Sequence, residues 1–486
     1  MRIHHHTTNI VKKISIIISL IIIIVVNIIR FIGLEQSPVG FQVDELGSAV
    51  TIQCMATEGK DALGRPFSLF EDLNFGTPKP PTYIYPGLLW TKLFGFSIAS
   101  FRAYSGFYVV MAIIGLFFLA NLLFGREYGL LTVLTATISP WIWTFSRVAF
   151  ESILSPCYLI WGLYFFLRSN RKRDLIISGI LFSFAMYSYP PTRAQLPLLL
   201  LPLILFKKHL HGLKKSSLIT FFLALIIISI PLIYKTLNGQ LQSRFNRIGI
   251  ISDAYLSSIG KEKNLIDLLS IFIHNYLLHF SPNFLFFKGD ANYIHSTQFV
   301  GELSWLDTFA LGAGIIFLTI IFIRAITKKK KPSYQYTIFI LFLITNIAIG
   351  IIPSALTWLD LPHALRTIGS WPFTCMLFAF ILWQLTKRWT VTYIPIILIA
   401  TAFISFYLYD YFTKYPIRSY GMFCPWAKIE AMTAHTDIDW LKFMIKYRHR
   451  NMEFVYYLMN YKPGETCSSA LKKWRYFHQE RFLKHK

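Results

Sequence analysis

The sequence predicts an all-α polytopic membrane protein with about eleven transmembrane helices and long extracytoplasmic loops. Its 486 residues are 54% hydrophobic and 15% charged, whereas soluble domains average about 45–50% apolar and about 25% charged residues. Residues 14–32 contain no charge before Arg30, and about 20 apolar residues cross a bilayer. With aromatic residues at 17%, this composition excludes a disordered chain as well as a soluble globular protein.

The positive charges lie between the apolar runs. The formal net charge is +24, and basic clusters occur at 168–173, 207–215 and 324–331. This distribution is typical of cytoplasmic loops. No basic segment interleaved with aromatic residues is present, so nucleic-acid binding is not expected. The five cysteines are irregularly spaced and form no metal motif, and His4–His6 receive no role.

Each predicted span follows from an apolar run between polar segments. The first run is too long for a signal-peptide core and has no clear cleavage site, so we expect a membrane anchor. The predicted spans are 14–33, 101–124, 128–144, 150–167, 175–189, 194–206, 217–234, 305–323, 335–352, 365–386 and 390–410.

A cytoplasmic N-terminus places the basic clusters inside and three long segments outside: 34–100, 235–304 and 411–486. Loops of this length are usually functional or disordered. Residues 80–96 are amphipathic and aromatic, which favours a helix lying in the membrane interface.

The chain therefore divides into a transmembrane domain, 1–410, and a small extracytoplasmic C-terminal segment, 411–486. An oxidising compartment would permit Cys424 and Cys467 to pair in that segment, and whether they do is left open.

The first outer segment contains two groups of candidate residues. Asp44 and Glu45 are adjacent acids; they fit a general base or a cation ligand, or simply a helix N-terminus that favours negative charge. Lys79 stands between prolines, just before Tyr83 and Tyr85. It would pair with a lipid phosphate, or extend its ammonium group to the interface while its stem stays buried.

Further candidates follow along the chain. Arg147 and Glu151 are four residues apart, so they are expected to share a helix face, where a mutual ion pair is the alternative to a functional role. The later candidates are Tyr187, Tyr189 and Arg193 in YSYPPTR, Asp290, Asn292 and His295 in GDANYIH, and His363 and Arg366 in PHALR.

The predicted topology places all these groups on the outer face. Polar groups at membrane depth are costly and mark functional sites. An outward-facing site supplied with a lipid-borne substrate fits this distribution. A transporter or lipid flippase is the alternative, although transporters usually show internal repeats and polar residues near the midplane. A non-catalytic assembly partner would tolerate Asp44→Asn.

The order of these segments resembles the GT-C superfamily of membrane glycosyltransferases. The similarity is to the branch of protein O-mannosyltransferases and bacterial aminoarabinose (lipid A) transferases. It rests on Asp-Glu in a long first loop, then Lys-Pro-Pro with aromatics, SRVAFE, YSYPPTR, GDANYIH and PHALR. It covers residues 14–410, is strongest over 40–200, and does not extend to the C-terminal segment.

The resemblance implies transfer of a sugar from a polyprenyl-phosphate carrier to a lipid, glycan or protein acceptor outside the membrane. Asp44 matches the family's catalytic aspartate, with Glu45 as its acidic neighbour, and Glu151 occupies the position of a second acid that is commonly Asp. Lys79 matches a lysine that contacts the carrier phosphate, and Arg366 resembles a late-span arginine. The implied substrate-binding residues are Lys79, Tyr83, Tyr85, Arg147, Tyr189, Arg193, Asp290, His295, His363 and Arg366.

Two implications remain open at this point. Aminoarabinose transferases carry a metal-binding acid before the lysine, where this chain has Pro78; no metal ligand is therefore assigned, and a divalent cation stays a possibility. The composition and the absence of the large eukaryotic insert suggest a bacterial cytoplasmic membrane.

The chemistry agrees with these roles. A carboxylate within reach of an acceptor hydroxyl removes its proton during attack, and positive charge stabilises the departing phosphate. One base and a displaced phosphate predict inversion at the anomeric carbon.

Overall fold

The computed structural model describes residues 2–60, 66, 79–239, 241–328 and 334–423. Within these ranges the regular structure is helical, apart from two isolated β-bridges. The α-helices are α1 (Arg2–Ile29), α2 (Val43–Glu58), α3 (Pro81–Phe94), α4 (Ile98–Phe124), α5 (Arg126–Ile138), α6 (Pro140–Phe145), α7 (Leu154–Arg168), α8 (Lys172–Ser188), α9 (Pro190–His211), α10 (Lys215–Leu237), α11 (Ser243–Ile248), α12 (Asp253–Ser258), α13 (Leu265–Leu278), α14 (Trp305–Lys328), α15 (Tyr334–Ala355), α16 (Trp371–Arg388), α17 (Tyr393–Thr413) and α18 (Tyr415–Phe423).

The predicted all-α membrane fold is confirmed in its class. In the described part of the chain, six helices are long and apolar enough to cross a membrane: Ile10–Ile29, Ile98–Phe124, Lys215–Leu237, Tyr334–Ala355, Ile368–Arg388 and Thr390–Thr413. Every other predicted span also overlaps a helix; α14 has the apolar stretch Trp305–Ile316, and the remaining helices are shorter or less apolar. The count of about eleven spans therefore stays a prediction.

One predicted span is interrupted. The run 128–144 forms α5 and then α6, with Pro140 as the first residue of α6. Proline has no backbone N–H to continue the helical ladder, so it starts a new helix more readily than it extends one. Residues 146–150 then leave the helical conformation before a short 3₁₀ turn, η1 (Glu151–Ile153). The prediction that Arg147 and Glu151 share a helix face is therefore wrong.

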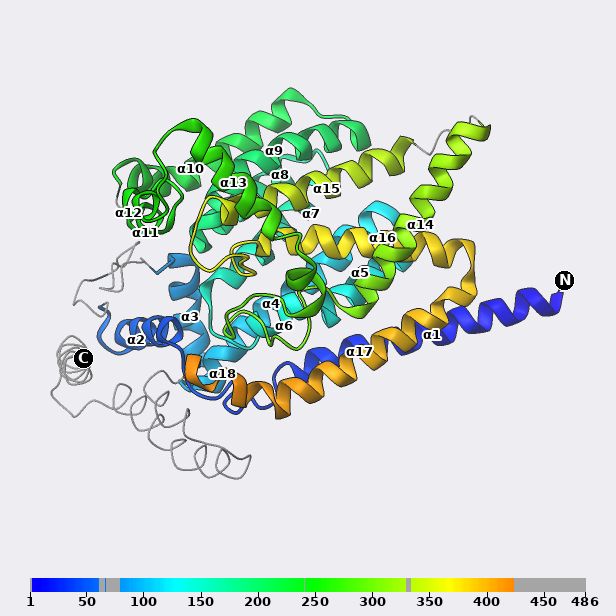
Figure 1. The fold of residues 1–486 in the computed structure, drawn as a ribbon, viewed down its shortest axis with the longest axis horizontal. Coiled ribbons are helices and arrows are strands. Elements are labelled where there is room, and N and C mark those ends of the chain that lie inside the picture. Colours follow the sequence, from blue (N-terminus) through cyan, green and yellow to red (C-terminus); the bar gives the residue numbers. More distant parts are fainter. Residues whose placement is uncertain (1, 61–65, 67–78, 240, 329–333, 424–486) are drawn as a thin grey trace.

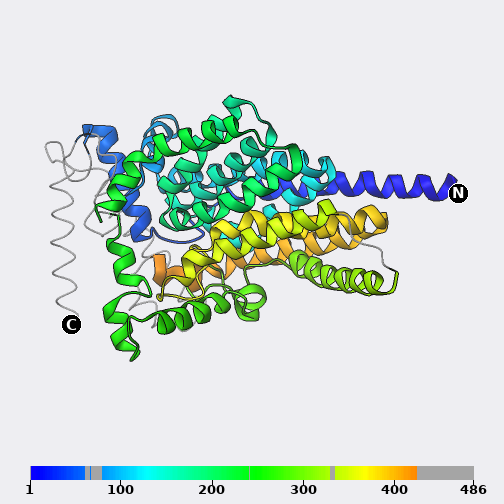
Figure 2. The same cartoon turned by 90° about the horizontal axis from the view of Figure 1, so that it is seen from above.

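The bundle has two distinct ends (Figures 1 and 2). The N-terminus of α1, the end of α14 and the start of α15 lie at one end, whereas α2, α3, α11 and α12 gather at the other. Helices α1 and α17 run side by side along one edge. Helices of the first two predicted outer segments, 34–100 and 235–304, therefore lie at the same end of the molecule.

The helix expected over 80–96 is present as α3, on which Leu89, Leu93 and Phe94 are exposed, and its place in the membrane interface stays a prediction. The predicted domain boundary at residue 410 falls inside a helix, because α17 continues to Thr413. Helix α18 follows and stays attached to the bundle, since the Tyr415 hydroxyl donates to the Tyr293 carbonyl.

The cysteines have different states. Cys54 on α2 is disulfide-bonded, and Cys157 and Cys375 are free and buried. Cys424 and Cys467, for which pairing was left open, lie outside the described residues.

Candidate functional site

Asp44 and Glu45 are placed by the start of α2. Gln42 is the N-cap, and its side-chain oxygen accepts from the Asp44 backbone N–H at 2.6 Å and from the Glu45 N–H at 3.4 Å. The Glu45 carboxylate returns a bond by accepting the Gln42 N–H at 3.0 Å. This reciprocal capping box fixes the first turn. It leaves Asp44 half-buried and Glu45 fully buried.

Glu45 forms a buried ion pair with Arg102 of α4. Arg102 donates from Nε and Nη2 to the two carboxylate oxygens, at 2.9 Å each. Its remaining N–H groups reach the carbonyls of Leu34, Pro38 and Gly40 at 2.7 Å. The Ala149 N–H also donates to Glu45, at 2.8 Å. The Glu45 carboxylate is thus fully engaged within the protein.

Lys79 lies between Asp44 and Glu151. Its Nζ is 3.2 Å from the Asp44 carbonyl oxygen and 3.5 Å from Oε2 of Glu151. The Lys79 side chain is 7% exposed and that of Glu151 is 24% exposed. The Asp44 carboxylate accepts from the Gln42 amide at 3.3 Å. The structure therefore brings together Asp44, Lys79 and Glu151, which sequence analysis had selected separately.

Arg147 does not pair with Glu151. Its guanidinium instead donates to carbonyls at the end of α1 and just beyond, including Arg30 at 2.8 Å and Ile32 at 2.7 Å. The guanidinium also lies over the rings of Tyr411 and Phe412. A cation at a helix C-terminus is stabilised by the exposed carbonyl dipoles. Arg147 therefore joins α1 to α17.

The predicted tyrosines lie in three environments. Tyr83 of α3 is fully buried, and burial raises the pKa of its hydroxyl well above the ordinary value. Tyr85 is half-buried. The Tyr187 hydroxyl donates to the Ile228 carbonyl at 3.0 Å, and Arg193 donates from Nε to the Met186 carbonyl at 3.1 Å.

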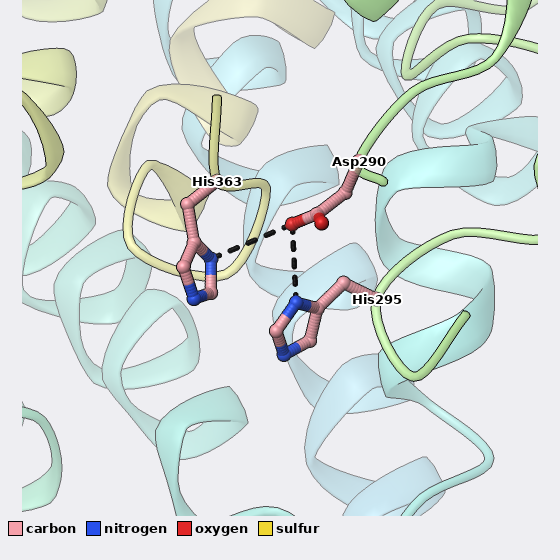
Figure 3. A group of neighbouring side chains, drawn as sticks. All are labelled: Asp290, His295 and His363. Atoms are coloured by element: carbon pink, nitrogen blue, oxygen red, sulfur yellow. Dashed lines mark hydrogen bonds and ion pairs between the residues drawn. The ribbon is translucent and has the colours of Figure 1, made fainter. Parts of the chain in front are cut away.

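A second cluster joins the segment after the π-helix η2 (Asn283–Phe287) to the segment before α16 (Figure 3). Oδ2 of Asp290 lies 3.1 Å from Nδ1 of His295 and 3.5 Å from Nδ1 of His363. The carboxylate is fixed by the backbone N–H of Asn292 at 2.8 Å and of Ala364 at 2.8 Å. All three side chains are nearly inaccessible to solvent.

His279 and Glu302 support this cluster and were not selected from the sequence. Nε2 of His279 accepts the His363 N–H at 3.1 Å, so Nδ1 carries the proton that bonds the Asn275 carbonyl at 2.9 Å. Burial lowers the pKa of His279 to about 4. Glu302 accepts the Asp290 N–H at 3.0 Å, and burial raises its pKa. Neither lies in a run of polar residues that would have marked it.

Arg366 completes the second cluster. Its Nη1 donates to the Thr357 hydroxyl at 2.9 Å and to the Leu359 carbonyl. Desolvation lowers the pKa of Arg366. The Tyr189 hydroxyl lies within electrostatic reach of Arg366, Glu151 and Asp290. Tyr189 therefore feels charges from both clusters.

Part of the chain matches a family of known membrane enzymes. Residues 78–234, about a third of the chain, match the family model of dolichyl-phosphate-mannose-protein mannosyltransferases. The predicted resemblance to GT-C membrane glycosyltransferases is confirmed. The glycosyltransferase match includes Lys79, Glu151 and Tyr189, whereas Asp44 and the second cluster lie outside it.

Several solved glycosyltransferase structures are similar to the chain. ArnT from Cupriavidus metallidurans bound to undecaprenyl phosphate is 13% identical, with a TM-score of 0.47, and the match covers 90% of this chain and 79% of ArnT. The Archaeoglobus fulgidus oligosaccharyltransferase in complex with Zn and sulfate is 13% identical, with a TM-score of 0.49 and coverages of 95% and 58%. No curated protein sequence matched.

Proposed function

We propose that this protein transfers a sugar from a polyprenyl-phosphate carrier to an acceptor hydroxyl at the outer face of the membrane. The observation that carries the proposal is the meeting of Asp44, Lys79 and Glu151 at one end of the bundle. The family match supports the donor class, because it includes Lys79 and describes enzymes that use a dolichyl-phosphate-linked sugar.

Asp44 is the general base in this proposal. Its carboxylate is half-buried and accepts one neutral hydrogen bond from Gln42, so further acceptor positions remain for a substrate hydroxyl. A base in this position takes the acceptor proton as the oxygen attacks the anomeric carbon. The carrier phosphate leaves from the opposite side, so the product has inverted configuration. A retained configuration would exclude this mechanism.

Lys79 contacts the departing phosphate. Its ammonium group is buried, with one carbonyl and one carboxylate as partners. In a site with little water, such a positive charge stabilises negative charge that develops on the phosphate. Glu151 orients Lys79 through the 3.5 Å contact and is therefore a positioning residue.

Arg366 provides a second cation, and its charge acts on Tyr189, as that of Glu151 does. Its bonds to Thr357 and Leu359 hold Nη1, which leaves the other edge of the guanidinium to contact an anion. Glu45 and Arg147, in contrast, have their polar atoms engaged by protein groups, and we assign them structural roles.

The proposed orientation places the end that contains α2 and α3 outside. The disulfide at Cys54 supports this, since disulfides persist in oxidising compartments. The opposite end contains the first half of α1, which includes Lys12 and Lys13, together with the end of α14 at Lys328 and the start of α15. Positive residues favour the cytoplasmic side. A bacterial cytoplasmic membrane remains our expectation.

A transporter or flippase remains the second candidate class. It would move the carrier without cleaving the sugar–phosphate bond. The clusters around Lys79 and Asp290 lie in connections and short helices, not within the six candidate spans, which favours an enzyme at the membrane surface.

The test is release of free polyprenyl phosphate by the purified protein in lipid bilayers. A panel of polyprenyl-phosphate pentoses and hexoses is supplied together with lipid, glycan or peptide acceptors. Acceptor-dependent release from one donor would identify the sugar and the acceptor class. Failure with every donor, including with crude envelope as acceptor, would contradict the proposal.

A further inference from the structure

Three ligand-type side chains converge in the second cluster. Asp290, His295 and His363 each offer one ligand atom, and the three atoms lie within 4.8 Å of one another (Figure 3). Two of the separations are 3.1 Å and 3.5 Å, between Oδ2 of Asp290 and the two Nδ1 atoms. A tetrahedral cation with bonds of about 2.0–2.1 Å has ligands separated by about 3.3 Å. Two edges of such a site are already formed.

The surrounding protein holds these ligands in place. The backbone N–H groups of Asn292 and Ala364 orient the Asp290 carboxylate. The His363 backbone is fixed by its N–H bond to His279. The carboxylate is buried, and an unpaired buried charge is costly.

We propose that Asp290, His295 and His363 form a binding site for one divalent transition-metal cation, with Zn²⁺ as the best match. Two imidazoles and one carboxylate are a zinc-type ligand set, whereas Mg²⁺ and Ca²⁺ prefer oxygen ligands throughout. Three protein ligands leave a fourth position for an anionic oxygen or water. The site is independent of the position before Lys79, where Pro78 offers no ligand.

The competing explanation is a metal-free hydrogen-bonded Asp–His pair. In that arrangement the Nδ1–H of a histidine donates directly to Asp290, and the cluster only joins two segments. A hydrogen-bonded pair has no affinity for Zn²⁺ above that of ordinary surface histidines. Metal affinity therefore separates the two explanations without reference to sugar transfer.

The test uses the full chain, purified without a polyhistidine tag, with His4–His6 changed to alanine because consecutive histidines bind metal themselves. Zn²⁺ binding is measured by equilibrium dialysis with elemental analysis, and the coordination geometry by visible absorption of the Co²⁺ form. We expect one bound equivalent. Asp290→Asn, His295→Gln and His363→Gln should each weaken binding by at least about tenfold.

His274→Ala is the matched control, since His274 is an exposed histidine on α13. It should bind Zn²⁺ like the parent protein. Gel filtration shows whether each variant is folded, and three separate variants protect the test against one that is not. Zn²⁺ affinity that is absent from the parent, or unchanged in folded variants of all three ligands, would overturn the proposal.

Discussion

Glu45→Gln tests whether Glu45 has a structural role that is separate from the proposed catalytic role of its neighbour Asp44. Arg102 has five N–H groups, and all five have acceptors in the structure, two of them the oxygens of Glu45. The glutamine removes the charge and turns an amide donor toward the guanidinium. Both side chains of the pair are 0% exposed. Removing one partner from a buried pair costs about 3–5 kcal/mol, because the other charge is left uncompensated.

Asp44→Asn is the matched comparison. Asp44 is half-buried and its carboxylate makes one side-chain hydrogen bond, to Gln42, so an isosteric amide should change stability by no more than about 0.5 kcal/mol. Thermal unfolding of the two variants in the same detergent, followed by tryptophan fluorescence, measures the difference. Glu45→Gln should unfold at a clearly lower temperature than Asp44→Asn.

A double variant tests whether the ion pair between Glu45 and Arg102 is the source of the stability. Glu45→Gln combined with Arg102→Met removes both charges, and its loss of stability should be smaller than the sum of the two single losses by about 0.5–3 kcal/mol. Additive losses would refute the ion pair as the source of the effect. A Glu45→Gln protein with parental thermal stability and no activity would assign Glu45 to the chemistry and refute our structural role for it.

Three further predictions concern the cations and the buried histidine. Lys79→Met should lower the rate of donor cleavage at least about a hundredfold. The control Lys92→Met changes an exposed lysine on α3 and should have no effect. Equal rates for the two variants would remove Lys79 from the phosphate site. Arg366→Lys should impair turnover although it keeps the charge. A lysine cannot bond the Thr357 hydroxyl and the Leu359 carbonyl and also contact an anion through two parallel hydrogen bonds. Full activity of this variant would place Arg366 outside the site. The pKa of His279 is lowered from 6.5 to about 4, so its stabilising contribution is complete above pH 6.5 and is lost as the pH falls toward 4, by about 2 kcal/mol between pH 7 and 5. His279→Asn should flatten that part of the stability profile, and an unchanged profile would contradict the assignment.

Periodicity and charge predicted the helical class because apolar runs and basic clusters are local features of the sequence. The predicted spans 128–144 and 150–167 left a break between them, but Arg147 was still expected to share a helix with Glu151, whereas residues 146–150 are not helical. Arg147 was assigned to the substrate from its type alone. Its partners are carbonyls at the end of α1, more than a hundred residues earlier, and no local pattern reveals them.

The convergence of Asp44, Lys79 and Glu151 was predicted from topology and is present as contacts. His279 and Glu302 were beyond sequence analysis, because they act through backbone N–H groups of Asp290 and His363. A buried acceptor of this kind has no characteristic spacing. The sequence therefore predicted which segments meet, and the structure supplied the groups that hold them there.

The central claim is that Asp44 removes a proton from the acceptor while a polyprenyl phosphate leaves. The most direct measurement is release of polyprenyl phosphate from the preferred donor in proteoliposomes by the parent protein, by Asp44→Asn and by Asp253→Asn, which changes an exposed acid of the second outer segment. We expect release by the parent and by Asp253→Asn, and a loss of at least about a hundredfold in a stably folded Asp44→Asn protein. Parental release by Asp44→Asn would contradict the account.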